Sequence, residues 1–179
     1  MDGLSNSIIT GVDILLMVTL LVCCYTDLRS QKIYNAVLIP AVVAAFVFSY
    51  ITGGLGGCFY SLQGLLLGIA LLLIPFARGG IGAGDVKLLG TIGAFKGPEF
   101  VLTTFLAGAI TGGIFAILML VKQGRLMITL KKIYFLFLNK VLHIPISVSF
   151  KTLDSAVEGE SFPYALAIGI GVVWAFFRG

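Results

Sequence analysis

Charged side chains are scarce in this sequence. Of its 179 residues, 11% are charged and 59% are hydrophobic, whereas about a quarter of the residues in an ordinary soluble domain carry a charge. The mean hydropathy is +1.09, so much of the surface as well as the interior must be apolar. This composition excludes a soluble globular domain and predicts a membrane protein. The net charge of +4 is then explained by cytoplasmic loops, and we expect no nucleic-acid partner.

Residues suited to metal or covalent chemistry are also few. The cysteines Cys23, Cys24 and Cys58 form no C-x-x-C pair, and the single histidine, His143, has no ligand or nucleophile motif around it. Zinc sites and disulfide frameworks require such residues at characteristic spacings. We therefore expect no metal and no cofactor, and we interpret the cysteines as small apolar residues and His143 as structural.

Long uncharged runs dominate the chain. The run 33–77 is interrupted only by the glycine-rich stretch 52–57, and because a bilayer core needs about 20 helical residues, it predicts two spans joined by a glycine hairpin. The runs are too long for barrel strands, and pairs such as Gly64 and Gly68 suit close helix packing. We expect an all-α bundle of about six transmembrane helices in one membrane-embedded domain, 1–179. The predicted spans are 8–26, 35–51, 58–76, 86–95, 100–121 and 161–177.

Basic residues fall on one side of this arrangement. If the loop with Arg29 and Lys32 lies inside the cell, ten of the twelve basic residues are cytoplasmic, and only Lys96 and Arg178 are not. This distribution satisfies the positive-inside rule. The segment 124–146 mixes lysines with apolar residues, which predicts an amphipathic helix on the cytoplasmic side or a further part of the bundle.

Two acids lie at the inner ends of predicted helices. Asp27 ends the first span and Asp85 opens the fourth, so both carboxyls lie near the cytoplasmic face, on different helices. Acids at such positions are usually functional. Two adjacent carboxyls share one proton and can activate a water molecule as in aspartic peptidases. Gly82 and Gly84 leave room beside Asp85 for a substrate strand, whereas Asp13 lies about 21 Å from Asp27 along a helix and is interpreted as structural.

Three blocks of the sequence resemble those of type IV prepilin peptidases. The segment 82–89, GAGDVKLL, resembles the G-x-G-D-x-K signature of that family. The segment 26–35, TDLRSQKIYN, resembles the block in which an aspartate ends a helix, although Tyr34 stands where the family usually has proline. The segment 162–169, FPYALAIG, resembles a late block of the family. The three blocks occur in the same order as in that family.

This resemblance implies a membrane aspartic endopeptidase that removes the leader from type IV prepilins or pilin-like precursors. The site would lie at the cytoplasmic face of a bacterial or archaeal inner membrane. It implies that Asp27 and Asp85 are the catalytic pair and that Gly82 and Gly84 shape the site. Lys87 would meet a substrate acid or a lipid phosphate, or simply extend to the interface.

Larger members of that family carry a cytoplasmic domain with paired C-x-x-C motifs and also methylate the new N-terminus. The sequence contains no such motifs, so we expect neither a zinc domain nor methyltransferase activity. The chain resembles the compact prepilin peptidases of tight-adherence (Flp-type) pilus systems.

Two alternatives remain open. Presenilin and signal peptide peptidase share a G-x-G-D aspartate, but their other acid follows a tyrosine directly, whereas Thr26 separates Tyr25 from Asp27 here. A small proton-coupled transporter or channel would use Asp13, Asp27 and Asp85 as a relay. A relay needs acids staggered through the membrane, whereas a peptidase needs two acids at one depth.

Overall fold

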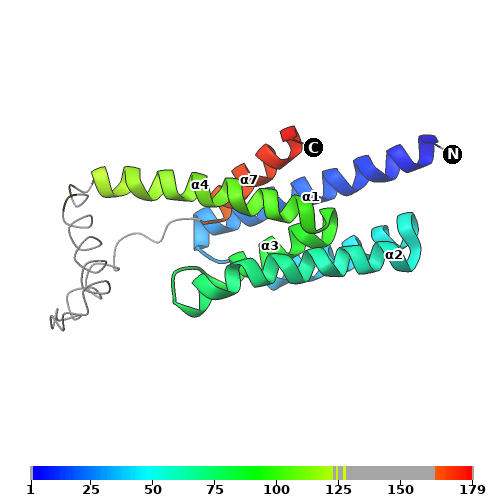
Figure 1. Cartoon of the computed structure of the whole chain (residues 1–179), viewed down its shortest axis with the longest axis horizontal. Coiled ribbons are helices and arrows are strands. Elements are labelled where there is room, and N and C mark those ends of the chain that lie inside the picture. Colours follow the sequence, from blue (N-terminus) through cyan, green and yellow to red (C-terminus); the bar gives the residue numbers. More distant parts are fainter. Residues whose placement is uncertain (1, 123, 125–126, 128–163, 179) are drawn as a thin grey trace, which may run out of the picture. The chain divides into compact units, whose positions relative to one another are not determined.

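The computed structural model describes residues 2–122, 124, 127 and 164–178, and all the elements in this part of the chain are helices (Figure 1). The predicted helical class is therefore confirmed. Contacts divide the chain into two units, Met1–Thr111 with Pro163–Gly179, and Gly112–Phe162. Most of the predicted amphipathic segment, with His143, lies outside the described residues. The helices are α1 (Asp2–Ser30), α2 (Asn35–Ala77), α3 (Ala83–Lys96), α4 (Pro98–Lys122) and α7 (Tyr164–Arg178).

Three of the described helices are long and apolar enough to cross a membrane, through Gly11–Ser30, Asn35–Ala77 and Pro98–Met119. α3 and α7 have 14 and 15 residues, which corresponds to about 21 and 22 Å, and the hydrocarbon core is about 30 Å thick. The structure thus supports a helical membrane protein but not the predicted six spans. Charge-free runs do not reveal where a helix stops, and α3 stops at Gly97, whose φ is 84°.

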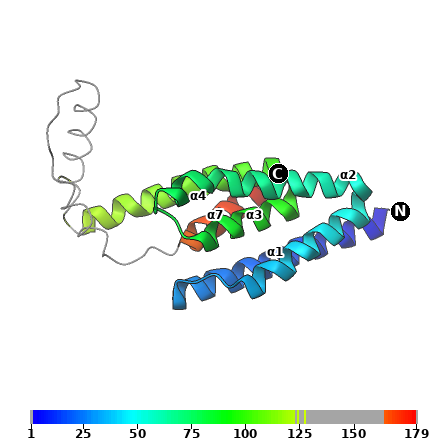
Figure 2. The same cartoon turned by 90° about the horizontal axis from the view of Figure 1, so that it is seen from below.

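α2 reverses its direction at Gly54. This residue has φ 58° and ψ −141°, a conformation that only glycine adopts readily. The Cys58 thiol lies 3.9 Å from the carbonyl oxygen of Phe46, although residues 12 apart in a straight helix are separated by about 18 Å. The helix therefore has two arms that run in opposite directions (Figure 2). The predicted glycine hairpin is confirmed.

α3 is the buried centre of the first unit, with ten of its 14 residues buried. The second arm of α2 packs closely against it: the Ser61 hydroxyl donates to the Ala94 carbonyl oxygen at 2.7 Å. A Cβ at Gly64 would collide with the Gly93 carbonyl, and one at Gly68 would collide with the backbone of α3. The predicted packing role of this glycine pair is confirmed, because any larger residue would push the helices apart.

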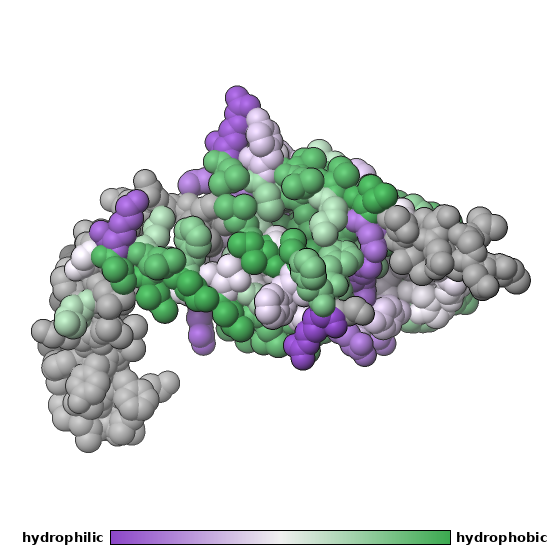
Figure 3. Space-filling model, turned by 90° about the horizontal axis from the view of Figure 1, so that it is seen from above, coloured by the Kyte–Doolittle hydropathy of each residue, from purple (hydrophilic) through white to green (hydrophobic). Residues whose placement is uncertain are grey.

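The described surface is largely apolar. Leu55 is 72% exposed and Phe177 is 88% exposed, and apolar side chains form a broad area on the face shown in Figure 3. Exposed apolar side chains are costly in water but normal on helices that face lipid. Such a surface accords with a membrane protein.

One end of the first unit carries a charged cluster. Lys96, at the end of α3, forms an ion pair with Asp13 of α1. The Lys96 ammonium group also lies over the rings of Phe100 and Phe176, 5.7 and 4.8 Å from their centroids. Lys96 was predicted outside the cytoplasm, and its ion pair with Asp13 supports the structural interpretation of Asp13.

Candidate active site

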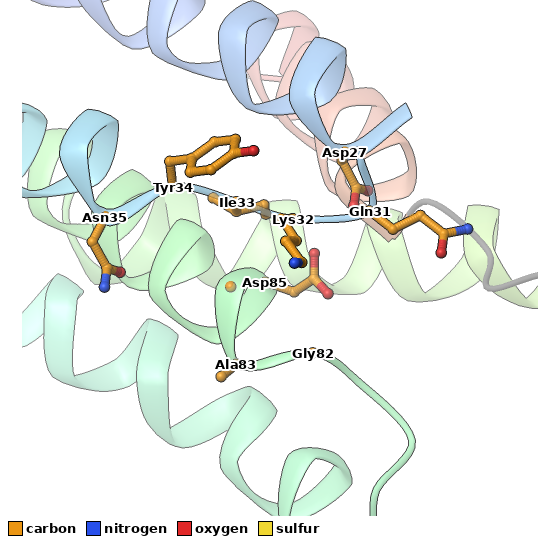
Figure 4. A pocket seen from close by; sticks show the side chains of 10 residues that line it. Asp27, Gln31, Lys32, Ile33, Tyr34, Asn35, Gly82, Ala83 and Asp85 are labelled. Atoms are coloured by element: carbon orange, nitrogen blue, oxygen red, sulfur yellow. The ribbon is translucent and has the colours of Figure 1, made fainter. Parts of the chain in front are cut away.

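Asp27 and Asp85 line one pocket of about 380 Å³ (Figure 4). Asp27 lies in the last turns of α1 and Asp85 in the first turn of α3. Both carboxyls project into the pocket. The structure therefore brings the two predicted acids together, while their catalytic role stays a prediction. The residues that line the pocket are Asp27, Gln31, Lys32, Ile33, Tyr34, Asn35, Gly82, Ala83, Gly84 and Asp85.

Asp27 is 8% exposed and is anchored by the beginning of α7. Its Oδ2 atom accepts a hydrogen bond from the backbone N–H of Ala165 at 3.2 Å. Ala165 is the second residue of α7, and N–H groups in the first turn of a helix have no acceptor within that helix. One turn before Asp27, the Cys24 thiol donates to the Ala165 carbonyl oxygen at 3.4 Å. α1 and α7 are thus joined at Ala165 by two hydrogen bonds.

Asp85 is 9% exposed, and its Oδ1 atom has no hydrogen-bond partner among the described residues. Asp85 belongs to α3, which is not one of the three long apolar helices. Burial, together with the nearby Asp27 carboxyl, raises the pKa of Asp85 from an ordinary value of 3.8 to about 6, and a hydrogen bond from the Gly82 backbone opposes the shift. Asp85 therefore keeps a proton more readily than an exposed aspartate.

The two predicted glycines have steric reasons to lie in this pocket. A Cβ at Gly82 would lie 3.2 Å from Oδ2 of Asp85, and one at Gly84 would lie 2.9 Å from Cβ of Ile33. Any side chain at Gly84 would therefore displace the connector 31–34 between α1 and α2. Gly84 allows the connector to lie against the first turn of α3, and Gly82 leaves space for the Asp85 carboxyl.

The connector itself was not predicted as part of the site. Gln31 closes α1 with φ 50°, and its backbone N–H donates to the Asp27 carbonyl oxygen at 2.9 Å, an arrangement typical of helix C-termini. At the far end of the connector, Lys87 Nζ donates to Oδ1 of Asn35 at 3.0 Å. The contact of Lys87 with a substrate acid or a lipid phosphate stays a prediction.

Ala165 was also not predicted as a site residue. Its signal was present in the late block 162–169, because the first turn of a helix offers unpaired N–H groups. Asn35 likewise belongs to the block that begins at Asp27. Within the described residues, no group of three or more His, Cys, Asp or Glu side chains could hold a metal ion.

The fold and the pocket define a helical membrane protein with two carboxyls in one partly enclosed site. The model of the type IV leader peptidase family matches residues 14–117. This match covers more than half of the chain, so the chain belongs to the type IV leader peptidase family. It is therefore a membrane protease, and the resemblance to prepilin peptidases is confirmed. No curated protein and no solved structure shows a significant match.

Proposed function

We propose that this protein is an aspartic endopeptidase that removes the leader peptide from type IV prepilins or pilin-like precursors. The observation that supports the aspartic mechanism is the shared pocket of Asp27 and Asp85 on the ends of two helices. The family supports the class of substrate. The location that we propose is the cytoplasmic face of a bacterial or archaeal inner membrane.

The surroundings of the two carboxyls suggest different roles. Asp27 accepts a backbone N–H bond, which suits an ionised carboxylate, so we assign Asp27 as the general base that takes a proton from the attacking water. Asp85 has a raised pKa and an unpartnered Oδ1, so we assign it as the protonated partner. It donates to the carbonyl oxygen of the scissile bond, and the proton taken up by Asp27 then goes to the leaving amine.

The substrate approach follows from the surface around the pocket. Exposed apolar side chains on the helices face lipid, so the hydrophobic segment of a precursor can reach the protein from within the bilayer. Gly82 carries no side chain beside the Asp85 carboxyl, so an extended peptide can approach Asp85 there, whereas Ile33 fills the space beside Gly84. The precursor leader would then lie at the connector 31–34, where Lys32 and Tyr34 are exposed.

The test is cleavage of a prepilin by the purified protein in detergent or liposomes. We expect Asp27→Asn and Asp85→Asn each to abolish leader removal, because the mechanism requires one carboxyl to take up a proton and the other to donate one. Loss of a general acid or base typically costs 10²- to 10⁴-fold in rate. Glu99→Gln, which changes an acid in the first turn of α4, is the matched control and should retain activity. Cleavage at the normal rate by a folded Asp27→Asn or Asp85→Asn variant would contradict the assignment.

A second experiment tests whether the reaction requires a metal. The proposed mechanism uses only the two carboxyls and water, so EDTA and 1,10-phenanthroline are expected to leave the cleavage rate unchanged. Cleavage assays before and after dialysis against each chelator measure this directly. A loss that zinc reverses would show that the carboxyl pair alone does not carry the reaction.

A further inference from the structure

We propose that the ion pair between Asp13 and Lys96 is a positioning device for the carboxyl pair: it sets the register of α1 along α3 and so keeps Asp27 and Asp85 at one depth. This inference rests on the proposed function, because it concerns the same two carboxyls. Asp13 and Lys96 lie at the opposite end of the helices from the pocket. They are therefore positioning residues that touch neither substrate nor reacting atoms.

The lengths along the two helices carry the argument. α1 and α3 run in opposite directions (Figure 1). Asp13 precedes Asp27 by 14 residues, about 21 Å, and Asp85 precedes Lys96 by 11 residues, about 16.5 Å. The long lysine side chain bridges the difference and reaches the Asp13 carboxylate. α1 and α3 are thus connected at one end by a salt bridge and carry Asp27 and Asp85 at the other end.

Partial burial and two aromatic rings surround the ion pair of Lys96 with Asp13. Its side chain is 21% exposed and that of Asp13 is 30% exposed, so both charges are partly shielded from water. The rings of Phe100 and Phe176 flank the ammonium group and pack edge to face with centroids 5.1 Å apart. Phe176 belongs to α7, the helix whose other end anchors Asp27 through Ala165. α1, α3 and α7 therefore contribute to both ends of the same assembly.

A charge pair specifies register more sharply than the apolar contacts along the helices. A shift of α1 by one turn moves Asp13 by about 5.4 Å and breaks the ion pair, and a partly buried charge without its partner is unfavourable. Apolar side chains such as Leu16 and Leu20 of α1 can pack against other apolar side chains after a similar shift. Loss of the ion pair therefore permits registers in which Asp27 and Asp85 are no longer level.

The variants Asp13→Asn and Lys96→Met test this directly in the full-length protein. We expect kcat for prepilin cleavage to fall about tenfold or more, because small displacements of catalytic groups cost on the order of 10²-fold. KM should change much less than kcat, since no residue that lines the pocket is substituted. The bell-shaped pH–rate profile should also narrow. Its width is the separation between the two apparent pKa values of the carboxyl pair, and this separation shrinks when the carboxyls lie farther apart and interact less.

Rescue variants separate positioning from simple loss of stability. Lys96→Arg keeps the charge and should keep kcat within about twofold, and the charge-exchanged double variant Asp13→Lys/Lys96→Asp should regain most of the turnover and the wild-type profile width. Glu99→Gln changes another acid near the same end and should alter neither kcat nor the width of the pH–rate profile. Failure of the double variant to regain turnover while folded, or an unchanged profile in active Asp13→Asn, would overturn the proposal.

A measurement independent of activity distinguishes this inference from the proposed function. Spin labels at Leu28→Cys and Ala83→Cys, with Cys23, Cys24 and Cys58 replaced by alanine, report the separation of α1 and α3 beside the pocket. Pulsed EPR should show a shifted or broadened distance distribution in Asp13→Asn and the original one in the charge-exchanged variant. An unchanged distribution in Asp13→Asn would overturn the register role, whereas cleavage by Asp27→Asn would overturn the proposed function alone.

Discussion

At the scale of single residues, the two site acids differ in what the fold gives them. Asp27 accepts a hydrogen bond from Ala165, whereas Oδ1 of Asp85 has no partner among the described residues. A buried polar atom without a partner costs free energy of folding. Asp85 is therefore a residue at which function and stability are opposed, and its removal should make the protein more stable.

The cost of Asp85 to the stability of the folded protein depends on pH in a defined direction. The folded protein raises the pKa of Asp85 from 3.8 to about 6, so the protonated form is favoured by folding and the ionised form is disfavoured. The wild-type protein should lose stability as the pH rises from about 4 to 6 and stay less stable above that range. Asp85→Asn lacks this ionisation and should be more stable than wild type at pH 8 by up to roughly 3 kcal/mol.

Thermal unfolding in detergent at pH 4 and pH 8 measures the effect. The difference between Asp85→Asn and wild type should be small at pH 4 and favour the variant at pH 8, and Glu99→Gln should follow the wild type at both values. A variant that is less stable than wild type at pH 8 would show that the Asp85 carboxylate is stabilised in the folded state.

Sequence patterns located the two acids but not their partners. Asp27 and Asp85 stand out because so few acids occur in an apolar chain and because both lie at the ends of predicted spans. Ala165 is 138 residues from Asp27, and its contribution is a backbone N–H that any residue type except proline would supply. A partner of this kind depends on tertiary packing and leaves little trace in residue type.

At the scale of the elements, glycines decide where helices reverse and how closely they pack. Gly54 reverses α2 and Gly64 brings α2 against α3. Both roles were predicted from the sequence, because glycine is the residue that permits positive φ and close backbone approach. α3 and α7 were predicted as membrane spans at 86–95 and 161–177, but with 14 and 15 residues both are shorter than a bilayer crossing. α3 ends at Gly97, whose positive φ is not revealed by hydropathy.

The neighbouring residues Gly53 and Gly54 provide a matched test of the reversal. A Cβ at either position would meet nothing within 4 Å, but only Gly54 has a positive φ, 58°. We expect Gly54→Ala to destabilise the protein by about 1–3 kcal/mol because of backbone strain. Gly53→Ala should be neutral or slightly stabilising, since alanine lowers the entropy of the unfolded chain.

Thermal unfolding of the two purified variants compares them directly, and the Cys58 contact with Phe46 provides a local measurement. Reactivity of the Cys58 thiol should rise in Gly54→Ala if the arms separate, and remain at the wild-type level in Gly53→Ala. Equal effects of the two substitutions would mean that the backbone conformation of Gly54 does not determine the reversal.

At the scale of the whole molecule, the topology connects the charge distribution to the site. The second arm of α2 runs from about Leu55 to Ala77, and Arg78 follows it as the C-cap. The 23 residues from 55 to 77 span about 34 Å, close to the thickness of a bilayer core. We therefore expect the two ends of this arm on opposite sides of the membrane. Arg78 lies four residues before Gly82 of the pocket, and by the positive-inside rule we expect this end on the cytoplasmic side.

Cysteine accessibility at the two ends tests this orientation. In a background with Cys23, Cys24 and Cys58 replaced, Leu55→Cys should react with a membrane-impermeant maleimide in spheroplasts, because Leu55 is 72% exposed and lies at the hairpin that we predict on the outer side. Arg78→Cys should react only in inside-out vesicles. The opposite pattern would place Asp27 and Asp85 on the outer face. A precursor leader that remains in the cytoplasm could not then reach the two carboxyls, so this result would contradict the proposed site of cleavage even if both aspartates proved catalytic.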